Sequence, residues 1–244
     1  MKEGKILNPL IVSCCTEDYF DMLYAMVKSG LQNIKSPNFY IELINITEDK
    51  CLKLEKLSPN IEILKSNIKF KNDTQKKCYS TNSRAKLLYE KRKSPQDILT
   101  WVDADSLILK DISEMLSELI KNNYDLGIVL RPNASKSAGA RGGFYCVCHK
   151  NPNGLKFLEN YYKKVSRLNL WQSIKSNDLK KHWKIWMANQ DVLNKYFYNP
   201  KELKIKKISN LFCDVRLKEE SFIWAAKNKL KTSEKYLTEL KKYN

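Results

Sequence analysis

The segment ILTWVDADSLIL, residues 98–109, decides the fold of this chain. It opens on apolar and β-branched residues without helical spacing, which predicts a short buried strand. That strand runs directly into Asp103-Ala104-Asp105. Residues two apart in extended backbone point to the same side, so we expect the two carboxylates to lie together. Open α/β sheets bind ligands beyond the carboxyl ends of their strands, so the segment predicts a ligand site.

The paired carboxylates suggest a site for a cation. Hard oxygen donors suit Mg²⁺ or Mn²⁺, and such an ion also bridges phosphate oxygens. The triplet alone is weak, because about 0.6 Asp-x-Asp triplets are expected by chance in a chain with twelve Asp. The alternative is a turn at a strand end with two solvated carboxylates. The strand before the triplet and the apolar run at residues 107–109 favour the cation site.

Expected strands and helices alternate on both sides of this segment. The other expected strands are residues 9–15, 39–46, 61–64, 126–130 and 143–148, and the expected helices are residues 18–31, 82–92, 111–122, 155–168 and 186–197. This alternation predicts an α/β fold with a mostly parallel, doubly wound sheet. We expect one domain over residues 1–226, followed by a basic amphipathic helix at residues 227–244.

The composition bounds the class of protein. The 244 residues are 43% hydrophobic and 11% aromatic, which argues against disorder. The 44 Lys+Arg minus 27 Asp+Glu give a net charge of +17, and 38 of those 44 are Lys. Such general lysine usage favours a solvated basic surface over a dedicated nucleic-acid patch. We therefore expect no nucleic-acid partner.

The cysteines and the N-terminus bear on the compartment. The chain has seven Cys, no CxxC pair, and only His149 and His182, so a zinc site is not expected. Buried thiols are typical of proteins in a reducing cytosol. The N-terminal residues do not form a signal peptide, and no run reaches the ~18 apolar residues that span a bilayer. A cytoplasmic protein is the prediction.

Two polar motifs flank the carboxylates along the chain. Asn189, Gln190 and Asp191 begin an apolar helical segment, from which amide and carboxylate groups can contact a bound sugar. The alternative is an ordinary helix start with Asn189 as the N-cap. Arg84 and Lys86 can bind a diphosphate, Arg84 through bidentate hydrogen bonds. The alternative for both is a solvated helix face.

Two further stretches could contribute to a ligand site. Residues 139–144 (GARGGF) hold three of the seven Gly, so the backbone there turns sharply or admits a close ligand. This stretch lacks the GxGxxG spacing of dinucleotide-binding folds. In residues 221–227, Trp224 precedes Lys227 by three positions, and the pair can close over a phosphate. The alternative places Trp224 in the core and Lys227 on the surface.

Taken in order, these segments resemble the GT-A nucleotide-diphospho-sugar transferases, in particular the glycogenin-like and bacterial galactosyltransferase-like group. The matching stretches are VSCCT at 12–16, RAK at 84–86, DAD at 103–105 and NQDVLN at 189–194. Three stretches depart from the group: Asn189 replaces an Asp, RGG at 141–143 replaces Asn-Ala-Gly, and WAAK at 224–227 replaces a late His-x-x-Gly-x-x-Lys.

The resemblance implies a glycosyltransferase that moves a sugar from a nucleotide-diphosphate donor, expected to be a UDP-sugar, to a glycan or lipid-linked acceptor. It implies Mn²⁺ or Mg²⁺ as cofactor, held by Asp103 and Asp105. The donor-binding residues that it implies are Cys15, Thr16, Arg84, Lys86, Asp103, Ala104 and Lys227. Since the late His is replaced, a third metal ligand is not assigned.

The same resemblance places Gln190 near the anomeric carbon, with Asn189 and Asp191 on the sugar hydroxyls. Kinship favours retention of the anomeric configuration. If Asp191 instead deprotonates the acceptor hydroxyl, the configuration is inverted. A sugar nucleotidyltransferase is one rival, although no Gly-rich, Arg/Lys-bearing loop follows the first expected strand. A non-catalytic basic module that binds nucleic acid is another, and it predicts steep salt dependence and no effect of Mn²⁺.

The basic C-terminal stretch suggests a membrane contact. Leu230, Leu237 and Leu240 can form one apolar stripe among the lysines at 227, 229, 231, 235, 241 and 242. A helix of this kind gains roughly 1 kcal/mol per basic residue near anionic lipid. The alternative is that the leucines pack on the domain and the lysines are solvated. The first interpretation predicts peripheral binding at the inner face of a membrane.

Overall fold

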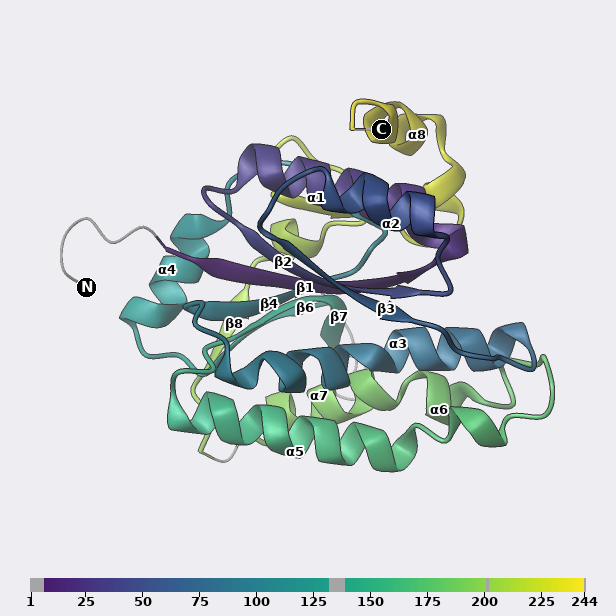
Figure 1. The fold of residues 1–244 in the computed structure, drawn as a ribbon. Coiled ribbons are helices and arrows are strands. Elements are labelled where there is room, and N and C mark those ends of the chain that lie inside the picture. Colours follow the sequence, from purple (N-terminus) through teal and green to yellow (C-terminus); the bar gives the residue numbers. More distant parts are fainter. Residues whose placement is uncertain (1–6, 132–138, 201, 244) are drawn as a thin grey trace.

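The computed structural model describes residues 7–131, 139–200 and 202–243. Its centre is a twisted sheet with helices on both faces (Figure 1). The seven strands of this sheet are β1 (Pro9–Thr16), β2 (Asn38–Ile44), β3 (Ile61–Ser66), β4 (Ile98–Val102), β6 (Leu126–Leu130), β7 (Ala140–Val147) and β8 (Ile205–Ile208). Their spatial order is β3-β2-β1-β4-β7-β6-β8.

The strand order creates a switch point between β1 and β4. From β1 the chain moves outward through β2 to β3, then returns to place β4 on the other side of β1. All pairings are parallel except those of β7, which runs antiparallel to both β4 and β6. The predicted mostly parallel, doubly wound sheet is confirmed, and ligands of such sheets bind at the carboxyl edge of the switch point.

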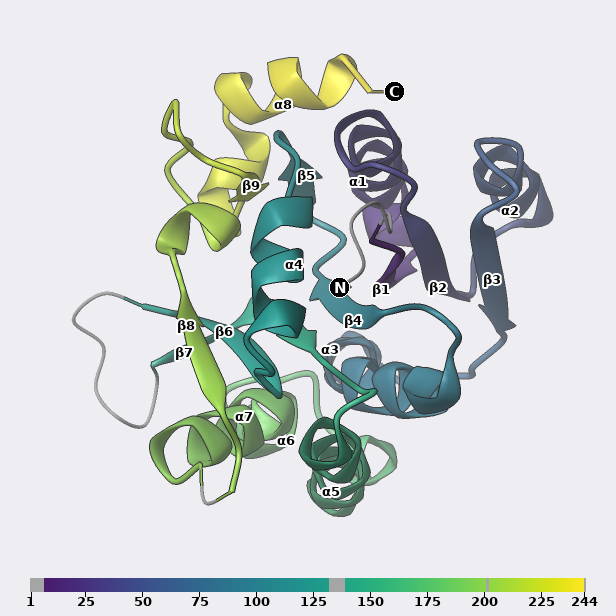
Figure 2. The ribbon, with the colours of Figure 1, turned by 90° about the vertical axis from the view of Figure 1, so that its left-hand side faces the viewer.

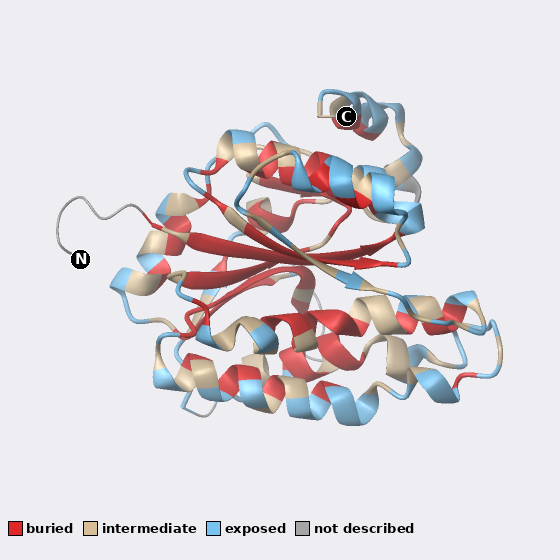
Figure 3. Ribbon diagram, viewed as in Figure 1, coloured by how far each residue is buried: buried red, intermediate tan, exposed pale blue. Residues whose placement is uncertain are grey.

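Helices cover the two faces because strand residues alternate between two cores. α1 (Phe20–Asn33), α2 (Glu48–Glu55) and α4 (Ser113–Lys121) pack with the core that contains Ile11, while α3 (Asp73–Glu90), α5 (Pro152–Leu168) and α7 (Ala188–Tyr198) pack with the core that contains Val12. Figure 2 shows these layers from the side. Figure 3 shows that the inner strands of the sheet are buried, whereas β3 at one edge and the outer faces of the helices are partly exposed. Burial of both sheet faces explains the near-continuous apolar run of β1.

Short elements complete the chain. They are η1 (Glu17–Tyr19), η2 (Lys91–Lys93), η3 (Trp171–Ser173), α6 (Trp183–Trp186), η4 (Asn210–Cys213), η5 (Asn228–Thr232) and α8 (Glu234–Lys241). A second, two-stranded antiparallel sheet pairs β5 (Ser106–Ile108) with β9 (Ile223–Ala225). It lies under α1 and α8 in a small core that contains Trp224, Tyr236 and Leu240.

The predicted continuous helix over residues 227–244 is wrong. Lys227 is extended (φ −121°, ψ 143°), and Ser233 is extended too (φ −68°, ψ 143°), so the segment breaks into η5 and α8. Ser233 ends the first piece and caps the second, since its side chain accepts a hydrogen bond from the Tyr236 N–H. Leu240 is buried, whereas Leu230 and Leu237 are each 40% exposed, so the three leucines form no single stripe.

Several other boundaries differ from the sequence pattern. α2, β5, β8 and β9 were not expected, because they are short or carry lysines. α3 begins at Asp73, nine residues before the expected start, because Asn72 caps it by accepting from the Gln75 N–H at 2.9 Å. All seven Cys are buried free thiols. In the described part of the chain, no helix is long and apolar enough to cross a bilayer.

Candidate functional site

Asp103 and Asp105 follow β4 at the carboxyl edge of the switch point. The Ser13 hydroxyl on β1 donates to the Val102 carbonyl at 2.7 Å, which ties the two strand ends together. The segment after Val102 is a turn rather than extended backbone, and the Ser106 N–H donates to the Asp103 carbonyl at 3.1 Å. The predicted extended geometry is therefore wrong, although the carboxylates do meet, through a shared partner.

That shared partner is Lys227. Its ammonium lies 2.9 Å from Oδ2 of Asp103 and 2.7 Å from Oδ1 of Asp105. The register of the small sheet explains the approach: Ala225 pairs with Ser106 in antiparallel fashion, so the chain after β9 runs back along Asp105 toward Asp103. Burial lowers the pKa of the Lys227 ammonium, yet the charges of the two carboxylates raise it above its usual value.

The remaining carboxylate oxygens have donors of their own. Oδ1 of Asp103 accepts from the Trp101 indole N–H at 2.8 Å and lies 3.3 Å from a terminal nitrogen of Arg84. Oδ2 of Asp105 lies 2.8 Å from the Lys231 ammonium. Burial raises the pKa of the Asp103 carboxyl, but Lys227 and Arg84 outweigh burial and hold that pKa below its usual range. Asp103 is therefore a carboxylate at neutral pH.

Arg84 is held in place from several sides. It is 7% exposed, its Nε donates to the Thr81 carbonyl at 2.8 Å, and Nη1 donates to the Gly142 carbonyl. Its guanidinium carbon lies 5.0 Å from the centre of the Trp101 ring. A Cβ at Gly142 would lie 2.7 Å from Nη1, so this glycine admits the arginine, which explains part of the glycine-rich stretch.

Lys86 does not join this cluster. Residues two apart on a helix point in nearly opposite directions, so the α3 geometry separates Lys86 from Arg84. The Lys86 ammonium lies 3.7 Å from Glu42 and 3.8 Å from Glu90. Only Arg84 of the predicted pair contacts Asp103.

The second predicted motif opens α7. Asn189 is 1% exposed, and its side-chain amide donates to the backbone carbonyl of Thr81 and to the side-chain Oδ1 of Asn82, each at 3.1 Å. It is not an N-cap: Met187 occupies that position and makes no side-chain capping bond. The alternative interpretation of Asn189 as a helix cap is therefore wrong. Because Thr81 also accepts from Arg84, Asn189 lies in the same hydrogen-bond network as the carboxylate site.

The two residues after Asn189 differ in environment. The Gln190 amide donates to the Ala140 carbonyl on β7 at 2.9 Å, and the residue is 9% exposed. Asp191 is partly exposed, and burial raises the pKa of its carboxyl above the usual value, with Lys195 opposing the shift. A carboxyl with a raised pKa is a stronger base when ionised.

The strand-end residues are enclosed. Cys15 is 3%, Thr16 7% and Ala104 9% exposed. Burial raises the pKa of the Cys15 thiol above its usual value, which disfavours the reactive thiolate form. These three residues border the site by position.

The sequence prediction missed Trp101 and Lys231. Trp101 lies two residues before Asp103, and the alternation of β4 could have placed it on the same side. Lys231 had no local signal, because it reaches Asp105 only through the turn of η5. Its pKa is lowered by burial but raised more by Asp105, so the net shift is upward.

The residues present do not fit a resident divalent cation. Within residues 7–131, 139–200 and 202–243, no group of three or more His, Cys, Asp or Glu side chains could hold a metal ion. Each oxygen of the two carboxylates already faces a donor or cation. The position that both carboxylates share is taken by the Lys227 ammonium. Mn²⁺ or Mg²⁺ binding stays a prediction from the sequence that this arrangement of side chains does not support.

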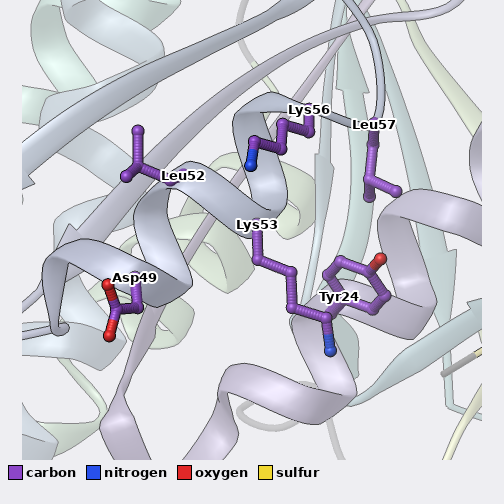
Figure 4. A pocket seen from close by; sticks show the side chains of 6 residues that line it. All are labelled: Tyr24, Asp49, Leu52, Lys53, Lys56 and Leu57. Atoms are coloured by element: carbon purple, nitrogen blue, oxygen red, sulfur yellow. The ribbon is translucent and has the colours of Figure 1, made fainter.

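A separate cavity of about 440 Å³ is lined by residues of α1, of α2 and of the turn after α2, none of which belongs to the carboxylate cluster. Figure 4 shows Tyr24 of α1 facing side chains of α2 and of the two residues that follow it, Lys56 and Leu57. Lys53 covers the Tyr24 ring, with its ammonium 4.2 Å from the ring centre. A smaller cavity of about 230 Å³ lies between α3 and α5 and is lined by Asn82 and Lys86 among others. Neither contains Asp103 or Asp105.

Comparison with known proteins shows similarity at the level of the fold. No protein-family profile and no curated protein matches the chain. Among solved structures, the glycosyltransferase GlyE of Streptococcus pneumoniae TIGR4 is similar with a TM-score of 0.53 at 12% identity, over 84% of this chain and 46% of GlyE. An active-site mutant of LgtC has a TM-score of 0.57 at 16% identity, over 83% of this chain and 74% of LgtC.

A third structure, the bifunctional glycosyltransferase WbbM in apo form, has a TM-score of 0.53 at 15% identity, over 99% of this chain and 45% of WbbM. The chain thus spans less than half the length of the GlyE and WbbM structures. It has a GT-A-like glycosyltransferase fold, as the sequence resemblance implied.

Proposed function

We propose that the protein transfers a sugar from a nucleotide-diphosphate donor, a UDP-sugar in the first instance, to a hydroxyl of a glycan or lipid-linked acceptor. One observation carries the proposal. Arg84 and Lys227 converge on Asp103 and Asp105 at the carboxyl edge of the switch point, in a fold shared with glycosyltransferases. A cluster of fixed cations at that edge suits a diphosphate.

The reaction sets the tasks of the site. The acceptor oxygen bonds to the anomeric carbon, the bond from that carbon to the diphosphate oxygen breaks, and its electron pair stays on the diphosphate. The products are the glycoside, the nucleoside diphosphate and the proton of the acceptor hydroxyl. Because negative charge develops on the leaving diphosphate, cations held in place beforehand lower the barrier. Arg84, Lys227 and Lys231 fill this role in the proposal.

The start of α7 supplies the groups for the sugar. In the proposal Gln190 lies near the anomeric carbon, with Asn189 and Asp191 on the sugar hydroxyls. The hydrogen bonds from Gln190 to Ala140 and from Asn189 to Asn82 fix both amides before a ligand arrives. Retention of configuration is the favoured outcome, and inversion follows if Asp191 accepts the acceptor proton.

Two parts of the proposal concern the location of the protein in the cell rather than the reaction. A cytoplasmic location and a peripheral membrane contact stay predictions from the sequence. The structure weakens the basis of the membrane contact, because Lys227 and Lys231 contact Asp103 and Asp105, and Leu240 packs in the core. Co-sedimentation with anionic vesicles at low salt tests the contact, and neutral vesicles are the control.

Thermal shift with a panel of nucleotide sugars tests the function. A ligand that binds only the native state raises the free energy of unfolding, by about 2.7 kcal/mol at a concentration 100 times its Kd. The melting temperature rises with it. UDP-sugars should raise it, and the stabilising donor should yield a transferred product. The Gln190→Ala variant should lose at least about tenfold in transfer rate, which is about 1.4 kcal/mol of barrier.

Gln172→Ala is the matched control, because Gln172 is exposed on η3. It should retain the transfer rate of the unaltered protein. A panel in which no nucleotide sugar shifts the melting temperature, with or without Mn²⁺, would overturn the proposed function.

A further inference from the structure

We propose that the Lys227 ammonium takes the position of the divalent cation between Asp103 and Asp105, so that the site binds a nucleoside diphosphate without a metal ion. The inference rests on the proposed function for the ligand and on the geometry of the cluster for the cation. It is an alternative to the sequence prediction of Mn²⁺ or Mg²⁺ on these two carboxylates.

The distances make the ammonium and a cation mutually exclusive. Lys227 is 2.9 Å from Oδ2 of Asp103 and 2.7 Å from Oδ1 of Asp105, as in charge-assisted hydrogen bonds. Mg²⁺ bonds carboxylate oxygens at about 2.0–2.1 Å. An ion bonded to those same two oxygens would lie against the ammonium and repel it. Lys227 would therefore have to leave before a cation entered.

Charge balance leads to the same conclusion. The two carboxylates contribute −2, and the cations that contact them within the described residues, Arg84, Lys227 and Lys231, contribute +3, which leaves +1. The cluster is thus already cationic where a diphosphate would bring its negative charge. A divalent ion added beside all three would raise it to +3 in a largely buried place, which is costly.

The position of Lys227 is fixed by the fold and open to a ligand. β9 pairs with β5, the strand directly after Asp105, so the end of β9 faces the carboxylates. Lys231 follows four residues later and is held by Asp105 and the Tyr19 hydroxyl, at 2.8 and 3.0 Å. The Lys227 side chain is 35% exposed, so a phosphate from solvent can reach it. An anion that binds there meets a prearranged cation.

The first test uses Mn²⁺ alone, followed by electron paramagnetic resonance. The unaltered protein should bind no Mn²⁺ below about 1 mM, which is a weak affinity. Lys227→Ala frees the two carboxylates and should create a Mn²⁺ site. Adding Asp105→Asn to that variant should remove the site again. Stoichiometric Mn²⁺ binding by the unaltered protein, abolished by Asp105→Asn, would overturn the proposal.

The second test is titration calorimetry with UDP, in EDTA and in MnCl₂. The affinity of the unaltered protein should differ by less than about threefold between the buffers. Lys227→Ala should bind at least about tenfold more weakly in EDTA and should recover in MnCl₂. Lys241→Ala is the matched control, because Lys241 is an exposed lysine of α8, and its affinity should be unchanged. UDP binding that requires Mn²⁺ would refute the inference.

The two tests separate two kinds of failure. If no nucleotide binds the unaltered protein in either buffer, the proposed function and the metal-free ligand binding fall together. The Mn²⁺ titration needs no nucleotide and still decides whether Lys227 holds the position of the cation. If Lys227→Ala does not fold, Lys227→Gln keeps an amide donor for one carboxylate and serves in both tests.

Discussion

Docking of the C-terminal segment depends on Tyr236, and its truncation to Ala should destabilise the protein strongly. Tyr236 is fully buried, its ring centre lies 5.1 Å from that of Trp224 at 86°, and its hydroxyl donates to the Asp105 carbonyl at 3.3 Å. The ring therefore joins α8 to β9 and to the carboxylate turn.

The size of the effect follows from that burial. Truncation of a buried aromatic residue to Ala costs about 3–5 kcal/mol. A domain of this length loses about 2–4 °C of melting temperature per kcal/mol, so Tyr236→Ala should melt roughly 6–20 °C lower. Tyr236→Phe removes only a long hydrogen bond, worth about 0.5–1.5 kcal/mol, and should lower the melting temperature by a few degrees at most.

Calorimetry measures the melting temperatures, and brief digestion with a lysine-specific protease reports on the docked segment. Tyr236→Ala should be cut faster within residues 227–243, because undocking frees Lys227 and Lys231 from Asp105 and lets this backbone open locally to the protease. Leu237→Ala is the control on the same helix, since Leu237 is 40% exposed. Docking through Tyr236 is refuted if Tyr236→Ala melts within about 2 °C of the unaltered protein. It is also refuted if Leu237→Ala melts at a lower temperature than Tyr236→Ala.

Three further expectations follow from buried groups. Gly154→Ala should cost about 1–3 kcal/mol, because a Cβ there would lie 2.3 Å from the Cys148 carbonyl oxygen; a melt of this variant beside Lys163→Ala, at an exposed position of α5, checks it. Asp191→Asn should melt higher at pH 7 while losing transfer. Burial raises the pKa of Asp191, so folding favours the protonated carboxyl, and the stability of the unaltered protein falls as pH rises through that pKa. The difference in melting temperature between Asp191→Asn and the unaltered protein should therefore shrink toward pH 4. A difference that widens toward pH 4 counts against burial as the cause. Ellman's reagent at pH 8 should leave the thiols intact in the native protein and detect all seven after denaturation, since burial raises the pKa of Cys78 to about 11 and of Cys148 to about 12; a thiol that reacts within minutes contradicts this.

The sheet could be predicted because its signals are local. β1 and β4 read as apolar runs without helical spacing, and β4 ends at Asp103, so both strand identity and strand end are visible in the sequence. The alternation of strands and helices then fixes the doubly wound class, because parallel strands need helical crossovers. Short strands such as β5 and β9 were invisible, since their pairing joins residues more than a hundred positions apart.

What the sequence by itself determined was the fold class and the place of Asp103 and Asp105 at a strand end. What only the tertiary structure decided was which charges meet them. The α3 helix turns Arg84 inward and Lys86 outward. The β5–β9 pairing and the break at Ser233 bring Lys227 and Lys231 onto the carboxylates, where the sequence pattern predicted one basic amphipathic helix. Electrostatic contacts depend on distance in space, and Lys227 is 124 residues from Asp103 along the chain.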